Sequence, residues 1–125
     1  MTECVAVFGG SFNPPHVGHV LVASYLLAMM ECDRVLVVPC FRHPFGKSLA
    51  PFEVRLQMCE AAFGWMPRVE ISTVERDLGG ESRTLRTLRH IADAHPGWSL
   101  RLVIGTDVVQ EAPRWYGFDE VEKLA

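Results

Sequence analysis

The sequence predicts an α/β fold with a doubly wound parallel sheet, because short apolar runs alternate with longer helix-forming stretches. This strand–helix–strand order is typical of parallel strands joined by right-handed crossovers. The first run, Cys4–Phe8, is continuously apolar, as expected of a strand buried on both faces. The other predicted strands are Val35–Pro39, Val69–Ser72 and Leu100–Ile104, and the predicted helices are Val17–Met30, Phe52–Phe63 and Arg83–Ala94. The expected architecture is a Rossmann-like sheet with helices on both faces.

Composition limits the class of protein. The 125 residues suit one domain with its own core, and 49% of them are hydrophobic. A net charge of −3 argues against a broad nucleic-acid surface. No apolar run approaches the roughly 20 residues that cross a bilayer, and the first residues lack the pattern of a signal peptide. We therefore expect a cytoplasmic protein with neither nucleic acid nor membrane as a partner.

The cysteines and two of the tryptophans favour a structural role. Cys4, Cys32, Cys40 and Cys59 form no C-x-x-C pair, so we interpret them as small apolar residues in a reducing compartment. Trp65 and Trp98 belong to no recognisable motif and are expected in the core.

Ligands of doubly wound sheets bind beyond the carboxyl ends of the strands. That rule predicts function in four segments: Gly9–His19, Pro39–Lys47, Thr73–Thr84 and Gly105–Trp115.

The segment after the first strand carries the densest chemistry. Gly9 and Gly10 allow the backbone to turn and to approach a ligand closely. Asn13 is a suitable N-cap residue, and the two prolines after it suit the entry to a helix. The first turn of that helix is expected to offer free N–H groups and partial positive charge to an anion.

Two histidines belong to the same turn. His16 and His19 are three residues apart and so share a helix face, while Gly18 keeps the surface between them low. This pair suits a phosphate that gains charge during reaction. An H-x-x-H pair can also bind a metal, but no third ligand is evident, and two unrelated surface histidines are the other alternative. Neither G-x-G-x-x-G nor the P-loop motif is present.

Gly9 to His19, G-G-S-F-N-P-P-H-V-G-H, resembles the signature of bacterial nicotinate-mononucleotide adenylyltransferases, members of the H-x-G-H nucleotidyltransferase superfamily. The resemblance implies that His16 and His19 are catalytic. It also implies a set of ATP-binding residues in this segment: Gly9, Gly10, Ser11, Phe12, His16, Gly18 and His19.

A lysine and an arginine extend the resemblance. Lys47 matches the family's lysine-bearing loop and would be a third catalytic group, although three residues separate it here from His43. A solvated loop lysine is the alternative. Arg55 resembles an arginine at the head of the family's second helix, where an ion pair and a ligand contact are both open.

Later segments imply the nucleoside and acceptor sites. Gly105 and Asp107 resemble the family's G-[AT]-D, which contacts the adenosine, although Asp107 is also a possible N-cap. Thr84 and Trp115 match residues that bind the pyridine mononucleotide, and core packing is the alternative for Trp115. At two other positions of the acceptor segment, Arg83 and Arg86, this chain departs from the family's tyrosine and aspartate.

The resemblance implies adenylyl transfer from ATP to nicotinate mononucleotide, with release of pyrophosphate and with Mg²⁺ bound to ATP. The alternatives are a related enzyme with another phosphate acceptor and a nucleotide-binding domain without catalysis. The family continues past this region with an I-S-S-T-x-[IV]-R segment that holds ATP phosphates. We therefore expect residues 1–125 to form one nucleotidyltransferase domain whose C-terminal part is lacking or not shown, and to bind ATP weakly and turn over poorly or not at all.

Overall fold

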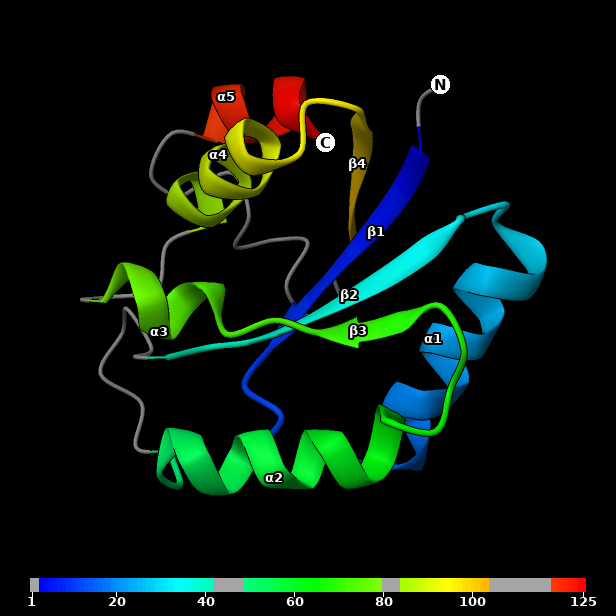
Figure 1. Ribbon diagram of the computed structural model, residues 1–125, viewed down its shortest axis with the longest axis vertical. Helices are drawn as coiled ribbons and strands as arrows, with labels where there is room; N and C mark the ends of the chain where they lie inside the picture. Colours follow the sequence, from blue (N-terminus) through cyan, green and yellow to red (C-terminus); the bar gives the residue numbers. More distant parts are fainter. Residues whose placement is uncertain (1–2, 42–48, 80–83, 104–117) are drawn as a thin grey trace.

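The fold is a parallel sheet between two layers of helices (Figure 1). The computed structural model describes residues 3–41, 49–79, 84–103 and 118–125, without the side chains of residues 118 and 122. In these ranges the strands are β1 (Glu3–Gly10), β2 (Arg34–Pro39), β3 (Val69–Ile71) and β4 (Trp98–Val103). The helices are α1 (Val17–Met29), α2 (Phe52–Phe63), α3 (Val74–Leu78), α4 (Thr84–Ala94) and α5 (Phe118–Leu124).

The strand order β3-β2-β1-β4 confirms the doubly wound prediction. The chain moves outward from β1 to β2 and β3, then returns to place β4 on the other side of β1. Every pairing is parallel, with Val7 of β1 opposite Leu36 of β2 and Leu102 of β4. All the strands therefore end at one edge of the sheet, where the switch point between β1 and β4 also lies.

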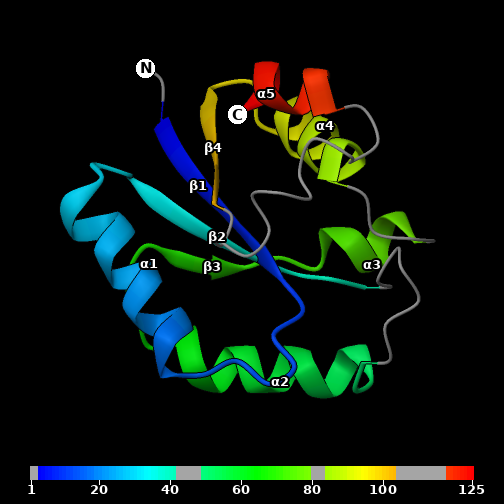
Figure 2. The same ribbon diagram turned by 180° about the vertical axis from the view of Figure 1, so that it is seen from behind.

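Successive side chains of β1 point to opposite faces of the sheet and contribute to two separate cores. Ala6 and Phe8 pack with α1 and α2, where Phe63 is fully buried. Val5 and Val7 face the opposite layer, where Leu88 of α4 is fully buried. The two views of the ribbon show α1 and α2 on one side of the sheet, and α4 and α5 on the other (Figure 2). Each central strand is thus covered on both faces, which explains its continuous apolar sequence.

The tryptophans divide between surface and core. Trp65 is 69% exposed, so the expectation that it lies in the core is wrong. It follows the end of α2, where its Nε1–H donates to the Ala62 carbonyl (2.7 Å) and the indole stays at the surface. Trp98 is partly buried and packs against the α4 core, as expected.

The cysteines behave as small apolar residues. All four are free, Cys32 and Cys59 are buried, and Cys4 and Cys40 are half-buried. Burial raises the pKa of the Cys59 thiol to about 11, which leaves it protonated and unreactive near neutral pH.

Within the described residues, no helix is long and apolar enough to span a bilayer.

The difference between Phe63 and Trp65 gives a stability prediction. Phe63→Ala opens a cavity beside Phe12 and should lower the free energy of unfolding by about 3–5 kcal/mol. Trp65→Ala, two residues away, removes an exposed ring and should cost less than about 1 kcal/mol. Urea denaturation followed by circular dichroism measures both. Equal losses would contradict the placement of these two aromatic residues.

Candidate functional site

Gly9 and Gly10 are the last two residues of β1 and lie at the carboxyl edge of the sheet. Gly9 and Gly10 stay in register with Val38 and Pro39, so the chain turns only after Gly10. The loop that follows runs from Ser11 to the start of α1 and includes a cis peptide bond between Asn13 and Pro14.

Phe12 anchors this loop. Its φ of 47° lies in the left-handed region, which costs a bulky residue on the order of 1–3 kcal/mol. Its ring is 2% exposed and makes edge contacts with Phe8 and Phe63, at centroid distances of 5.4 and 5.9 Å. Burial of the ring offsets the backbone strain.

The N-cap of α1 is His16, so the prediction that Asn13 caps this helix is wrong. The Gly18 N–H donates to His16 Nδ1 (3.1 Å), and the His16 N–H donates to His19 Nδ1 (2.9 Å). Asn13 instead accepts from the Ala50 N–H through Oδ1 (3.0 Å), which ties the loop to the segment before α2.

The bonds from the His16 and Gly18 amides to imidazole nitrogens also correct the expectation of free amides in the first turn. The amides of His16 and Gly18 are already used by imidazole nitrogens, and the His19 amide donates to the His16 carbonyl (2.9 Å). A nitrogen that accepts from an amide carries no proton, so a neutral ring must carry its proton on Nε2. The first turn thus offers an anion two Nε2–H groups in place of the amides of His16, Gly18 and His19.

The two rings form one unit. His16 and His19 stack with centroids 3.9 Å apart and planes 26° apart, and Phe12 packs against His19 at 4.9 Å. Burial lowers the pKa of His19, and the nearby His16 lowers it further. His19 is thus held as a neutral hydrogen-bond donor at neutral pH, a form suited to a developing negative charge.

Gly18 makes the capping geometry possible. A Cβ at this position would lie 2.8 Å from His16 Cε1, which is too close, and 3.0 Å from Nδ1, which is a tight contact. A side chain at position 18 would therefore require the His16 ring to shift, which would weaken its bond to the amide.

Arg55 is a buried cation at the carboxyl edge of the sheet. Its contacts are neither the ion pair nor the ligand contact that the sequence left open. Only 1% of it is exposed, and its guanidinium donates to main-chain carbonyls rather than lying open to a ligand. The acceptors are the carbonyls of Ala50 (2.8 Å), Ser11 (3.0 Å), Cys40 (2.6 Å) and Phe41 (3.5 Å). Burial lowers the pKa of Arg55.

Glu75 is a residue that the sequence did not single out. Its Oε1 accepts from the Phe41 N–H (3.3 Å), and its Oε2 accepts from the Thr87 hydroxyl (2.8 Å). The available signal was its position in α3, four residues after the end of β3, in a segment already expected at the carboxyl edge.

The remaining predicted site residues are only partly described. Thr84 is half-buried at the first position of α4, which starts at the carboxyl edge because the parallel strand β4 follows it. Arg86 donates to the carbonyls of Leu78 (2.7 Å) and Gly79 (2.8 Å). Four predicted residues lie outside the described residues: Lys47, Gly105, Asp107 and Trp115. Across the described ranges, no group of three His, Cys, Asp or Glu side chains could hold a metal ion.

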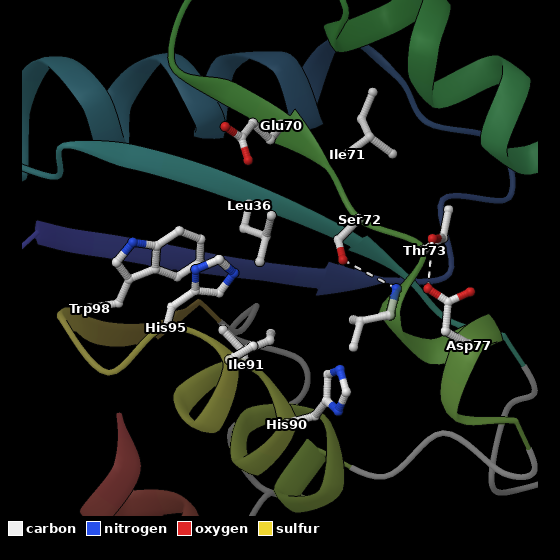
Figure 3. A pocket seen from close by; sticks show the side chains of 12 residues that line it. Leu36, Glu70, Ile71, Ser72, Thr73, Asp77, His90, Ile91, His95 and Trp98 are labelled. Carbon is white, nitrogen blue, oxygen red and sulfur yellow. Dashed lines mark hydrogen bonds between the residues drawn. The ribbon is translucent and has the colours of Figure 1, made fainter.

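A separate hollow of about 360 Å³ lies between β3, α3 and α4 (Figure 3). The rings of His95 and Trp98 stack in its wall with centroids 3.7 Å apart, and Thr73 donates to Asp77 (3.0 Å). None of the described residues that the sequence predicts individually for the site lines this hollow, although Thr73 and Asp77 of the predicted segment Thr73–Thr84 do. It is therefore distinct from the histidine loop.

Comparison with known families decides the affiliation. Residues 7–124 match the family model described as cytidylyltransferase-like. The chain belongs to the cytidylyltransferase-like family. A protein of Anaeromyxobacter dehalogenans strain 2CP-C named "Probable nicotinate-nucleotide adenylyltransferase" is 45% identical over 97% of this chain and 66% of its own length. A Myxococcus xanthus protein of the same name is 40% identical over 97% of this chain and 64% of its own.

A solved structure supports the fold. The nicotinic acid mononucleotide adenylyltransferase of Plasmodium falciparum, complexed with NaAD, superposes with a TM-score of 0.85 at 19% identity, over 95% of this chain and 60% of that one. This cytidylyltransferase-like chain thus spans just under two thirds of the curated relatives described above.

The role of Gly18 in this cytidylyltransferase-like chain can be tested without a ligand. In Gly18→Ala, the amide of residue 18 should exchange with solvent a few-fold to about tenfold faster, because it loses its acceptor on His16. Protection elsewhere in α1 should persist, since alanine favours helix more than glycine does. Native-state hydrogen exchange measures this, with Ser24→Ala as the control in the same helix. Unchanged exchange at residue 18 would contradict the steric argument.

The pKa of His19 gives a second prediction. An NMR titration of its ring protons should show a midpoint below the ordinary value of 6.5. Because the unfolded chain takes up this proton more readily, the stabilisation from His19 is present above pH 6.5 and is lost as pH falls through the lower folded-state pKa. His19→Asn should remove this component of the pH dependence. A midpoint at or above 6.5 would show that the ring is not desolvated as described.

Proposed function

We propose that this chain transfers the adenylyl group of ATP to nicotinate mononucleotide, releasing pyrophosphate. The observation that carries the proposal is the stacked His16–His19 pair, whose Nδ1 atoms are occupied by main-chain amides. Two neutral N–H donors on adjacent rings suit a phosphate that gains negative charge. The names of the relatives at 40–45% identity support the choice of acceptor.

The reaction needs positioning more than covalent chemistry. A phosphate oxygen of the mononucleotide would attack the α-phosphorus of ATP, forming a new P–O bond. The bond from that phosphorus to the α,β-bridging oxygen would break, and its electron pair would leave with pyrophosphate. Because the attacking phosphate is already anionic, no general base is required, and catalysis rests on alignment and charge stabilisation.

His16 and His19 would donate through Nε2–H to phosphate oxygens in this transfer. The end of β1, the loop after it and the start of α1 would receive ATP, through Gly9, Gly10, Ser11, the main chain of Phe12, and Gly18. Lys47 would add charge at the phosphates, and Gly105 and Asp107 would hold the nucleoside. Thr84 and Trp115 would contact the mononucleotide. Mg²⁺ would enter as part of the MgATP substrate, because it prefers phosphate and water oxygens as ligands.

An acceptor panel tests the proposal. The protein is incubated with MgATP and, separately, with nicotinate mononucleotide, nicotinamide mononucleotide, pantetheine phosphate or no acceptor. Pyrophosphate release and the mass of the product are both followed. A dinucleotide formed fastest from nicotinate mononucleotide is the expected result. A faster product from another acceptor would reassign the substrate, and ATP binding without any product would indicate a non-catalytic domain.

A matched pair of His19 variants separates chemistry from folding. His19→Asn keeps an acceptor near the position of Nδ1 but removes the Nε2–H donor, so turnover should fall by about 10²–10³-fold while the fold persists. His19→Gln keeps an N–H near the position of Nε2 and should retain more activity. Steady-state kinetics on both variants, with circular dichroism as the check on folding, measures this. Near-normal turnover in His19→Asn would remove His19 from the reaction.

A further inference from the structure

We infer that Arg55 and Glu75 are positioning residues that hold the ATP-side loop and the acceptor-side helix in fixed relation. The inference rests on the proposed function, because it concerns the alignment of the two substrates of that reaction. It depends on a chain of hydrogen bonds along the carboxyl edge of the sheet, from Ser11 to Thr87.

The first half of this chain is built on Arg55. Its Nη1 donates to the carbonyls of Ser11 (3.0 Å) and Cys40 (2.6 Å), so one nitrogen joins the ends of two neighbouring strands. The Cys40 N–H donates in turn to the Gly10 carbonyl (2.8 Å). Arg55 is 1% exposed, and loss of its guanidinium would remove the hydrogen bonds that join these carbonyls. The loop that carries His16 is thus fastened at its beginning.

The second half is built on Glu75. Arg55 also reaches the Phe41 carbonyl (3.5 Å), and the amide of the same residue donates to Glu75 Oε1 (3.3 Å). The other carboxylate oxygen of Glu75 accepts from the hydroxyl of Thr87, which is 5% exposed (2.8 Å). Phe41 is therefore the point where the arginine half and the glutamate half meet.

Thr87 connects this network to the acceptor side. It lies three residues after Thr84, so the two share one face of the first turn of α4. The loop and α4 lie on opposite sides of the sheet, with separate cores, and direct packing between their cores does not align them. The hydrogen bonds run around the edge of the sheet and provide a link that the two cores do not.

Alignment of this kind has a large effect on in-line transfer. A displacement of about 1 Å between reacting groups can lower the rate about 10²-fold, even when every catalytic group remains present. A network that fixes both substrate-binding elements is therefore expected to act on kinetics without touching a substrate.

The test removes the hydrogen bond at the acceptor end of this network, between Thr87 and Glu75. Thr87→Val preserves shape but removes the hydroxyl, whereas Thr87→Ser keeps the hydroxyl and serves as the matched control. Thr87→Val should raise the KM for the mononucleotide about tenfold and leave the KM for ATP within about twofold, because a bond to a carboxylate is lost only on that side. A merely structural role would lower the free energy of unfolding and leave kcat and both KM values of the folded protein unchanged, and that result would overturn the inference.

A double-variant cycle tests the connection itself. Arg55→Lys keeps the charge but cannot reach all the carbonyls, so both KM values should rise. If the residues act through one network, Arg55→Lys with Thr87→Val loses less than the product of the two single losses, by more than about twofold. Losses that multiply within about twofold would show two independent sites and would overturn the inference.

Hydrogen exchange separates this inference from the proposed function. If the unaltered protein forms no dinucleotide with any acceptor, the proposed function fails, but the network can still be measured. Glu75→Gln and Thr87→Val should both speed exchange at the Phe41 amide, and Glu75→Gln should also speed exchange at the amides of Ser11, Phe12, Asn13 and His16, while Thr87→Ser should do neither. Unchanged exchange in the first two variants would overturn the inference whatever the activity.

Discussion

Two hydrogen bonds from main-chain amides to imidazole nitrogens determine the chemistry of this site. The amides of Gly18 and His16 occupy one nitrogen on each ring, and so the opposite nitrogen carries the proton. The start of a helix ordinarily offers its own amides to an anion. Here the imidazoles take those amides and present two N–H groups of their own, which extends the donor surface beyond the backbone of the turn.

The rest of the loop serves that arrangement. Gly18 leaves room for the His16 ring, and Phe12 gives His19 an apolar surface to pack against. Phe12 adopts a left-handed backbone conformation and is held there by its buried ring. At the base of the loop, Arg55 fastens the Ser11 carbonyl from a helix far along the chain. The buried ring of Phe12 and the buried cation of Arg55 thus hold the loop in this conformation.

The doubly wound sheet gives this loop its partners. Because parallel strands all end at one edge, the loop after β1, the segment after β2 and the start of α4 converge there. The two sides of the sheet have separate cores, and each packs its own helices. The loop after β1 and the start of α4 are therefore aligned by polar contacts and not by the apolar layers. These contacts involve Arg55, Phe41, Glu75 and Thr87.

The sequence predicted what depends on local pattern. Continuous apolar runs located the strands, and the density of glycine and histidine after β1 predicts the site. Residue pattern could not predict the cap of α1, because histidine is not a usual N-cap residue and its role here depends on the missing side chain at Gly18. The roles of Arg55 and Glu75 depend on contacts with residues 44 and 34 positions away, which spacing does not reveal. Trp65 was misplaced because hydrophobicity alone does not distinguish the end of a helix from its buried face.

The protonation pattern of the two imidazoles is the most direct test of this arrangement. In ¹⁵N-labelled protein at pH 7.5, long-range ¹H–¹⁵N spectra distinguish a protonated ring nitrogen from a bare one. For both His16 and His19, we expect the bare-nitrogen shift at Nδ1 and the protonated shift at Nε2, with the Nδ1 signals perturbed by their amide donors. A proton on Nδ1 of either ring would contradict the capping geometry and the donor pair that follows from it.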